Sequence, residues 1–296
     1  MNYISRILIC VIILLQFVCP IFGQNVFIAV IDGVRYSEAF GSEGKYMPHM
    51  WNKLRPQGTI YTNFRNDGHT ATISGHVALM TGTRQKLIND GTQRSSHPTL
   101  FEYFRKQKTL PEKSCYVVSG KTKLEALTYS TAADYGSKYR ASFSYGKKND
   151  IETWKELVDV MTKHHPPLVL VTFVETDLNG HGDNWKGYLR TLQRADSLVN
   201  LLWERIQADS IYKNSTTLFV TSDHGRHDDE HGGFQDHGCS CEGCQHIMLL
   251  ALGPKFKPNA VVSDSSSQID LTPTIAQILG LTLPRLSGKS LINSKK

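Results

Sequence analysis

Apolar runs alternate with helical patterns along most of the chain. Strand-like apolar runs occupy residues 25–31, 115–119, 168–174, 217–221 and 246–252, and an alternating run occupies 59–64. Helical patterns occupy residues 47–54, 74–80, 100–106, 151–163, 185–208 and 269–279. Strands that alternate with helices are typical of α/β proteins. We therefore expect an α/β fold, with a mostly parallel central sheet and helices on both faces.

The first 23 residues differ from the rest of the chain. Arg6 is their only charged residue, and the apolar stretch over 7–18 is short for a membrane span. This layout predicts a signal peptide over 1–23, followed by a single domain over 24–296 in a secreted or periplasmic protein. An uncleaved anchor or a lipid on Cys19 is the alternative, although the residue before this cysteine is not the small one that lipid attachment prefers.

Composition limits the possible functions further. A chain of 296 residues with 40% hydrophobic residues can bury a full core. Its net charge of +6 becomes +5 when Arg6 is removed, and the basic residues are spread out without interleaved aromatics. This pattern does not predict nucleic-acid binding and is compatible with a small anionic substrate. Residues 128–150 lack a clear period, and we expect an irregular excursion there that could cap a site.

Acidic residues follow three of the predicted strands. Asp32 comes directly after the first strand, Asp177 follows the strand over 168–174, and Asp223 follows the strand over 217–221. Because parallel strands end at one edge of a sheet, these carboxylates are expected to converge. Convergent carboxylates repel one another unless a cation lies between them.

The segment over 221–237 has the composition of a metal site. It contains four histidines, four aspartates and one glutamate within seventeen residues. Imidazole and carboxylate groups together suit zinc and similar divalent ions. The alternative is a solvated charged loop, which the position of Asp223 and His224 at a strand end disfavours.

Four cysteines lie beyond the predicted signal peptide. They are Cys115, Cys239, Cys241 and Cys244. An even number in an exported protein favours disulfides, which would staple the loop after His237. The alternative is a structural zinc site, in which His246 would have to complete a set of three thiols.

The order of these segments resembles the alkaline phosphatase superfamily, and its nucleotide pyrophosphatase/phosphodiesterase branch in particular. The segments that carry the resemblance are Ile31-Asp32-Gly33, the run from Thr72 to Gly82, Asp177-x-x-x-His181, the run from Thr221 to Gly225, and a late histidine. Residues 268–276 and 286–291 also resemble the closing helix and tail of these enzymes.

The resemblance implies two divalent metal ions, with zinc expected. The first ion would be held by Asp177, His181 and His237; the second by Asp32, Asp223, His224 and the hydroxyl of Thr72. His231 is the alternative to His237, because both precede a glycine. Thr72 is implied as the nucleophile in preference to Thr70, because its distance from the Thr81-Gly82 turn matches the family pattern. Asn89 falls where relatives carry a donor to the phosphoryl oxygen.

The implied activity is hydrolysis of a small phosphate ester through a covalent phosphothreonine. The residues do not distinguish a monoester from a diester. A monoesterase would need a further cation, for which Lys138 and Arg140 are candidates. Sulfatase chemistry is disfavoured because the Cys-x-Pro-x-Arg motif is absent from the chain. A phosphotransferase or mutase on the same site is a further alternative, and a non-catalytic exported metal-binding module is another.

Overall fold

The computed structural model describes residues 24–292, so the signal peptide expected over 1–23 lies outside the described part of the chain. A nine-stranded sheet forms its centre, in the order β4-β3-β5-β1-β6-β7-β2-β8, with β9 also paired to β2. The strands are β1 (Asn25–Ile31), β2 (Gly58–Arg65), β3 (Cys115–Ser119), β4 (Ser142–Tyr145), β5 (Leu168–Phe173), β6 (Thr216–Thr221), β7 (His246–Leu252), β8 (Ala260–Val262) and β9 (Ser266–Ser267).

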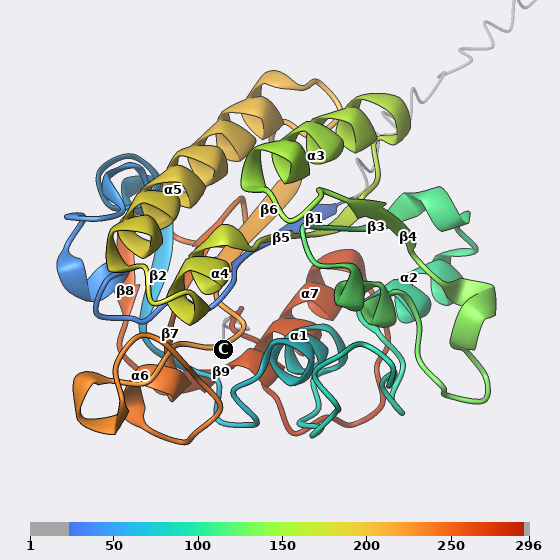
Figure 1. Ribbon diagram of the computed structural model, residues 1–296. Coiled ribbons are helices and arrows are strands. Elements are labelled where there is room, and N and C mark those ends of the chain that lie inside the picture. The colour runs from blue at the N-terminus through green and yellow to red at the C-terminus, as the bar shows by residue number, and fades with distance from the viewer. Residues whose placement is uncertain (1–23, 293–296) are drawn as a thin grey trace, which may run out of the picture.

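Strand direction decides where the strand ends meet. Strands β3, β4, β5, β1 and β6 are parallel, whereas β7 runs antiparallel to both β6 and β2. Two reversals return β2 to the direction of β1, so β7 alone of the nine strands runs the other way. The predicted mostly parallel α/β fold is confirmed. As a result, the carboxyl ends of β1, β5, β6 and β2 lie at the same edge of the sheet (Figure 1).

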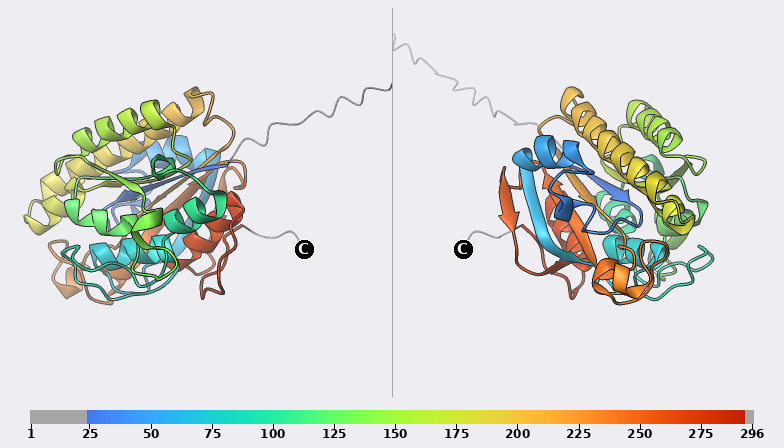
Figure 2. Two further views of the ribbon diagram at one scale, coloured as in Figure 1. Left: turned by 90° about the vertical axis from the view of Figure 1, so that its right-hand side faces the viewer. Right: turned by 60° about the vertical axis from the view of Figure 1, so that its left-hand side comes forward.

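Helices cover both faces of this sheet. One face carries α1 (Thr72–Thr81), α2 (Leu100–Lys108) and α7 (Leu271–Leu279), and the other carries α3 (Asp150–His164) and α5 (Trp185–Ala208), as Figures 1 and 2 show. The short helices α4 (Glu175–His181) and α6 (Glu242–Gln245) lie near the carboxyl edge. No helix within residues 24–292 is long and apolar enough to cross a membrane.

The position of β1 between two hydrophobic cores explains its continuous apolar run. Phe27, Ala29 and Ile31 pack into the core beneath α5, while Val26 and Ile28 pack into the core on the α1 side. Because side chains alternate between the two faces of a strand, a strand with a core on each face needs apolar residues at every position. All seven residues of β1 are buried.

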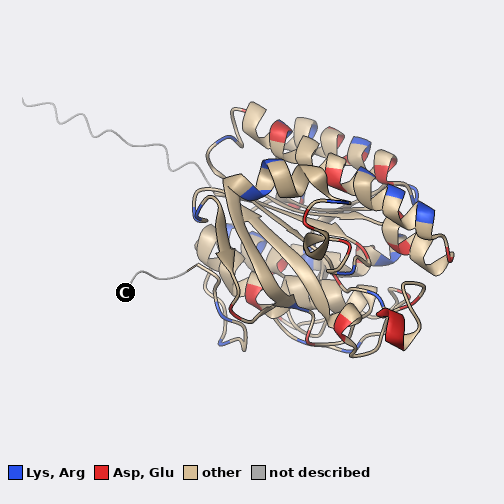
Figure 3. Ribbon diagram, turned by 90° about the vertical axis from the view of Figure 1, so that its left-hand side faces the viewer, with Lys and Arg blue, Asp and Glu red and all other residues tan. Residues whose placement is uncertain are grey.

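Short 3₁₀ and π helices complete the described part of the chain. They are η1 (Phe40–Ser42), η2 (Met50–Leu54), η3 (Arg55–Gln57), η4 (Glu112–Ser114), η5 (Thr122–Thr128), η6 (Gly136–Tyr139), η7 (Asp229–His231) and η8 (Gln268–Asp270). Charged residues of both signs are interspersed along the outer helices in Figure 3, in keeping with their spread along the sequence.

The excursion expected over 128–150 is partly regular. It contains η6 and the edge strand β4, which pairs in parallel with β3. The four residues of β4 are only half-buried, and a four-residue alternation is too short to distinguish from a loop. The excursion therefore extends the sheet at its β3 edge.

Candidate metal centre

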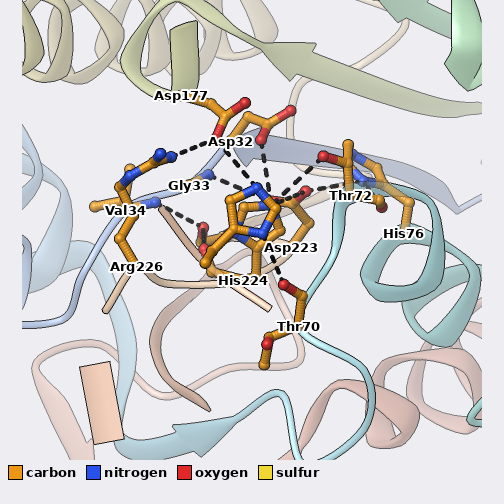
Figure 4. Close-up of polar contacts among 12 residues, drawn as sticks. Asp32, Gly33, Val34, Thr70, Thr72, His76, Asp177, Asp223, His224 and Arg226 are labelled. Carbon is orange, nitrogen blue, oxygen red and sulfur yellow. Dashed lines mark hydrogen bonds and ion pairs between the residues drawn. The ribbon is translucent and has the colours of Figure 1, made fainter. Parts of the chain in front are cut away.

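The acids that follow β1, β5 and β6 converge at the carboxyl edge of the sheet. Asp32, Asp177 and Asp223 are each at most 2% exposed. His224 Nε2 lies 3.6 Å from Asp32 Oδ1 and 3.4 Å from Asp223 Oδ2. Figure 4 shows these side chains pointing toward one another. The convergence expected from the strand ends is present in the structure.

Two carboxylate oxygens in this group have no hydrogen-bond partner among the described residues. They are Asp32 Oδ1 and Asp223 Oδ2, and both are buried. A buried charged oxygen without a partner is costly, so a missing positive group is expected beside it. These oxygens and His224 Nε2 are close enough together to bind one ion. The donor set of two carboxylates and one imidazole fits a divalent metal.

The orientation of His224 is fixed by its other ring nitrogen. His224 Nδ1 lies 2.8 Å from the carbonyl oxygen of Gly225. Because a carbonyl can only accept a hydrogen bond, Nδ1 carries the proton and the lone pair of Nε2 faces the two acids. Metal-binding histidines are commonly held in this way.

A second group of donors adjoins the first. His237 Nε2 lies 3.2 Å from His181 Nε2 and 3.8 Å from Asp177 Oδ1. His237 Nδ1 lies 2.8 Å from the carbonyl oxygen of Thr70, which leaves the lone pair of Nε2 facing the group. The ring of His237 also stacks on that of His224, with 3.8 Å between ring centroids.

His231, the alternative late histidine, lies elsewhere. It is paired with Asp228 within its own loop, and its side chain is 55% exposed. The structure therefore brings His237, and not His231, to the carboxylates.

Two basic side chains, neither of them among the site residues expected from the sequence, enter the centre. Lys121 Nζ lies 2.7 Å from Asp32 Oδ2 and 2.6 Å from Asp177 Oδ2. Arg226 is fully buried and donates from Nη1 to Asp177 Oδ1. Lys121 could have been found by the same strand-end rule as the acids, because it follows β3. Nothing in the sequence around Arg226 distinguishes it from a loop cation.

Gly33 makes room for this arrangement. Its φ of +69° is rarely adopted by other residues, and a Cβ here would lie 2.8 Å from both Arg226 Nη1 and Asp177 Oδ1. At the end of β1, Asp32 thus supplies a carboxylate, and Gly33 leaves space for the ion pair between Asp177 and Arg226.

The charges in the centre do not balance. Burial, and then the charge of Asp223, raises the pKa of Asp32 to about 6. Burial acts to raise the pKa of Asp223 as well, but His224 and His76 outweigh it and hold that pKa below its ordinary value. Burial also acts to raise the pKa of Asp177, but Lys121 outweighs it and that pKa lies well below its ordinary value. All three carboxylates are therefore ionised at neutral pH, and the permanent cations paired with them among the described residues are Lys121 and Arg226. The remaining negative charge favours a bound cation.

Thr72 lies beside this charge cluster. It is the first residue of α1, it is buried, and its Oγ1 is 3.5 Å from His224 Nε2. Thr70 is committed elsewhere, because its hydroxyl donates to the carbonyl of Cys239 at 2.7 Å. Of the two threonines, Thr72 is thus the one whose hydroxyl lies beside His224.

Asn89 also lies at the start of α1. Its Oδ1 accepts from the N–H of Ile73 at 3.0 Å and from Lys123 Nζ at 3.1 Å. With the carbonyl oxygen occupied, the amide nitrogen of Asn89 is the group left to donate to a substrate.

The two cations suggested by the sequence make their contacts elsewhere. Arg140 pairs with Glu125 at 3.1 Å, and Lys138 lies over the ring of Tyr139, both in the segment at the β3 edge of the sheet. Lys121 and Lys123 are the lysines near the acids, where they contact Asp32, Asp177 and Asn89. They reach this edge because the segment after β3 starts at the same edge of the sheet as the acids.

The expected disulfides are not formed. The four cysteines of the described chain are free thiols. Cys115 begins β3 and so lies at the opposite edge of the sheet, out of reach of the other three. His246 does not join those three either, because it stacks on Tyr36 and bonds to the carbonyl of Thr62.

Comparison with known proteins identifies the family. A family model described as the Metalloenzyme superfamily matches residues 61–283. A 2,3-bisphosphoglycerate-independent phosphoglycerate mutase of Gracilaria tenuistipitata var. liui is 24% identical over 142 residues, which cover 47% of this chain and 26% of that protein. Arylsulfatase K of Xenopus laevis is 33% identical over 106 residues, which cover 36% of this chain and 19% of that protein. The chain thus spans only a minor part of these relatives.

Solved structures share the fold over nearly the whole chain. A protein in the alkaline phosphatase superfamily from Vibrio parahaemolyticus superposes with a TM-score of 0.68 at 14% identity, covering 93% of this chain and 71% of that one. Phosphonate monoester hydrolase from Silicibacter pomeroyi gives a TM-score of 0.65 at 14% identity, covering 90% and 76%. The chain belongs to the metalloenzyme superfamily, with the fold of the alkaline phosphatase superfamily and the divalent-metal chemistry that this family implies.

Proposed function

We propose that this protein hydrolyses phosphate esters, with Thr72 as the nucleophile and a covalent phosphothreonine as the intermediate. One observation carries the proposal. The buried hydroxyl of Thr72 lies at the N-terminus of α1, 3.5 Å from His224 Nε2 and beside two unpartnered carboxylate oxygens. A hydroxyl at such a place can reach a phosphate that the helix N-terminus and a metal would both attract.

The residues fit two divalent ions, and zinc is the metal we expect from their mixture of imidazole and carboxylate groups. One ion would be held by Asp32, Asp223 and His224, with Thr72 Oγ1 beside them. The other would be held by Asp177, His181 and His237, whose donor atoms lie 3.2–3.8 Å apart. The first set fits better, because Asp177 already accepts from Lys121 and Arg226. When bound, the ions supply positive charge to the phosphate oxygens and lower the pKa of the nucleophilic hydroxyl.

The protein's own groups bind and orient the phosphate. The N-terminus of α1 contributes the positive end of its dipole. Asn89 supplies an amide donor at the same helix end, and Lys123 adds an ammonium group beside it. These donors would neutralise the charge that develops on the phosphoryl oxygens.

The reaction then proceeds in two displacements. Thr72 Oγ1 attacks phosphorus, a new Oγ1–P bond forms, and the P–O bond to the alcohol breaks, with the alcohol leaving as it gains a proton. Water then attacks phosphorus, the Oγ1–P bond breaks, and inorganic phosphate or a phosphomonoester is released. Thr72 recovers its proton in this second step.

The class of ester that the protein hydrolyses has to be determined by assay. Relatives include a protein named arylsulfatase and another named mutase, so sulfate-ester hydrolysis and phosphoryl transfer are the alternatives. Threonine at position 72 supports phosphoryl chemistry. We further expect an exported enzyme acting on a small molecule, on the strength of the pattern over residues 1–23.

Replacement of the nucleophile tests the proposal. We expect Thr72→Ala to lower kcat on 4-nitrophenyl phosphate or its bis ester by on the order of 10³ to 10⁶-fold, the range seen when a covalent nucleophile is removed. Bound metal, measured by elemental analysis, should remain at the wild-type level. Nitrophenyl sulfate should be a poor substrate.

The matched control is Thr70→Ala, two residues earlier on the same segment. It should retain measurable turnover, because the hydroxyl of Thr70 faces Cys239. Loss of activity in Thr70→Ala together with full activity in Thr72→Ala would place the nucleophile elsewhere. Preferred turnover of the sulfate ester would replace the phosphate-ester assignment.

A further inference from the structure

Three thiols and an imidazole meet in the loop between β6 and β7. His227 Nδ1 lies 3.0 Å from Cys239 Sγ, 3.4 Å from Cys244 Sγ and 3.8 Å from Cys241 Sγ. The sulfurs of Cys239 and Cys244 are 3.7 Å apart. All four donor atoms lie within 4.8 Å of one another. None of these residues belongs to the candidate metal centre described above.

These separations are those of a tetrahedral zinc site. Zinc binds thiolate sulfur at about 2.3 Å and imidazole nitrogen at about 2.0–2.1 Å. Tetrahedral angles then require about 3.8 Å between two sulfurs and about 3.6 Å between sulfur and nitrogen. The 3.7 Å between the sulfurs of Cys239 and Cys244 is close to the first value, and the nitrogen–sulfur distances of 3.0, 3.4 and 3.8 Å bracket the second. Three thiolates with one histidine form a common closed set for structural zinc.

The cluster is built into the fold around it. Cys244 is fully buried and Cys241 is nearly so, and the N–H of Cys241 lies 3.2 Å from Cys239 Sγ. Gly243 lets α6 pack against the segment that carries His227, because a Cβ here would lie 2.5 Å from the carbonyl oxygen of Arg226. The N–H of Gly225 donates to the carbonyl of Cys244 at 2.8 Å. The thiols are thus held toward His227 by backbone contacts.

A disulfide does not account for this arrangement. A bridge between any two of the three thiols would leave one thiol and the imidazole without a role. The fourth described cysteine, Cys115, lies at the far edge of the sheet. The 3.7 Å between Cys239 and Cys244 sulfurs also far exceeds the roughly 2.05 Å of a disulfide bond.

We propose that His227, Cys239, Cys241 and Cys244 bind a structural zinc ion. The site would crosslink a loop that has little regular structure, with only η7 and α6 in it. Its position links it to the catalytic region, because the carbonyl of Cys239 accepts from Thr70, whose own carbonyl accepts from His237 Nδ1. The ion would therefore hold the segment that presents His237, without itself contacting the substrate.

Cobalt substitution distinguishes this site from the candidate catalytic centre. The catalytic centre contains no cysteine among its donors, so thiolate-to-cobalt charge-transfer absorption in the near ultraviolet reports only the proposed site. We expect the full-length protein, stripped of metal and reloaded with Co²⁺, to show this absorption and the visible bands of tetrahedral cobalt. Absence of charge-transfer absorption in a folded, cobalt-loaded protein would overturn the proposal.

Variants and thiol chemistry complete the test. Cys241→Ser and His227→Ala should weaken the charge-transfer band and lower bound zinc by one equivalent, whereas the matched control Cys115→Ser should leave both unchanged. If the variants fail to fold, peptide mass spectrometry of wild-type protein still decides the matter. After denaturation with chelator and alkylation without reductant, Cys239, Cys241 and Cys244 should all be alkylated. A disulfide among them would contradict the zinc site.

Discussion

At the scale of single residues, the centre depends on hydrogen bonds that fix the ring nitrogens. His224 and His237 each donate from Nδ1 to a backbone carbonyl, so both direct the lone pair of Nε2 toward the carboxylates. Burial lowers the pKa of His237 to about 3. The imidazole of His237 is therefore neutral at physiological pH, the form that binds metal.

Replacement of each late histidine in turn tests whether His237 binds metal. Mutation of a residue that only hydrogen-bonds to a metal ligand weakens metal binding by roughly 10–100-fold. Because His237 would itself be a ligand, His237→Gln should weaken metal binding by more than this. His231→Gln should bind metal as the wild type does, because His231 is exposed and paired with Asp228. Metal titration of the two purified variants measures the difference. Equal affinities would remove His237 from the site.

At the scale of elements, helix α1 has to approach the β6 loop closely enough to bring Thr72 to His224. Gly75 permits this contact, because a Cβ at this position would lie 2.2 Å from the carbonyl oxygen of Asp223. The carbonyl is held by the side-chain amides of Asn66 and Gln268, at 2.8 and 2.7 Å. The helix and the loop thus form one rigid contact.

Gly75→Ala should disrupt that contact. We expect a loss of about 1–3 kcal/mol of unfolding free energy, the usual cost of overpacking, and a fall in kcat as Thr72 moves away from His224. Gly68→Ala is the control on the preceding loop, because its nearest contact would be an ordinary 3.4 Å. Urea unfolding and steady-state kinetics compare the two. A fully stable and active Gly75→Ala variant would show that the close approach is unnecessary.

Helix α3 is joined to the start of α4 by a buried acid. Asp150 Oδ1 accepts from the N–H of Val174 at 2.7 Å and of Glu175 at 3.2 Å, while Oδ2 is buried without a partner among the described residues. Burial raises the pKa of Asp150 to about 7, against the lowering by the Val174 N–H. The folded state therefore favours the protonated acid.

This raised pKa gives a pH-dependent prediction. Because the folded pKa exceeds the unfolded one, the contribution of Asp150 to stability is full below about pH 4 and is lost as pH rises to about 7. Asparagine does not titrate, so Asp150→Asn should remove this pH-dependent decrease in unfolding free energy. Relative to the wild type, the variant should gain about 3 kcal/mol of unfolding free energy between pH 5 and pH 8. Urea unfolding at both pH values measures it, and a difference that is independent of pH would contradict the assignment.

At the scale of the whole molecule, the sheet topology concentrates negative charge at one edge. Three buried acids come from segments as far apart as Asp32 and Asp223, and two buried cations only partly neutralise them. The unbalanced negative charge at this edge therefore destabilises the folded protein, and a bound metal would reduce that destabilisation. Stability and activity should both depend on metal.

Metal removal tests this dependence. Exhaustive dialysis against chelator should abolish ester hydrolysis and lower Tm, because a ligand at 100 times its Kd stabilises a protein by about 2.7 kcal/mol. Added Zn²⁺ should restore both properties, and chelator already saturated with zinc is the control. Activity that persists in protein shown to be free of metal would exclude the metal-dependent mechanism.

Much of the fold and part of the candidate site follow from local sequence patterns. The apolar run of β1 and the period of α5 mark a buried strand and an amphipathic helix, because a side chain's direction repeats with the period of its element. Acids directly after apolar strands are also visible in sequence, and the parallel sheet then dictates that Asp32 and Asp223 meet. The short edge strand β4 could not be predicted, since four half-buried residues carry too little periodicity.

Tertiary structure alone decided which distant groups face one another. The sequence by itself determined the α/β fold and the strand-end acids, because each depends on neighbours along the chain. The choice of Thr72 stays a prediction, which rests on the resemblance of its segment to a family pattern. It did not determine that Arg226 enters the centre, or that His227 rather than His246 joins the three cysteines. Those pairings depend on how loops fold back across the sheet edge, and no local periodicity records that path.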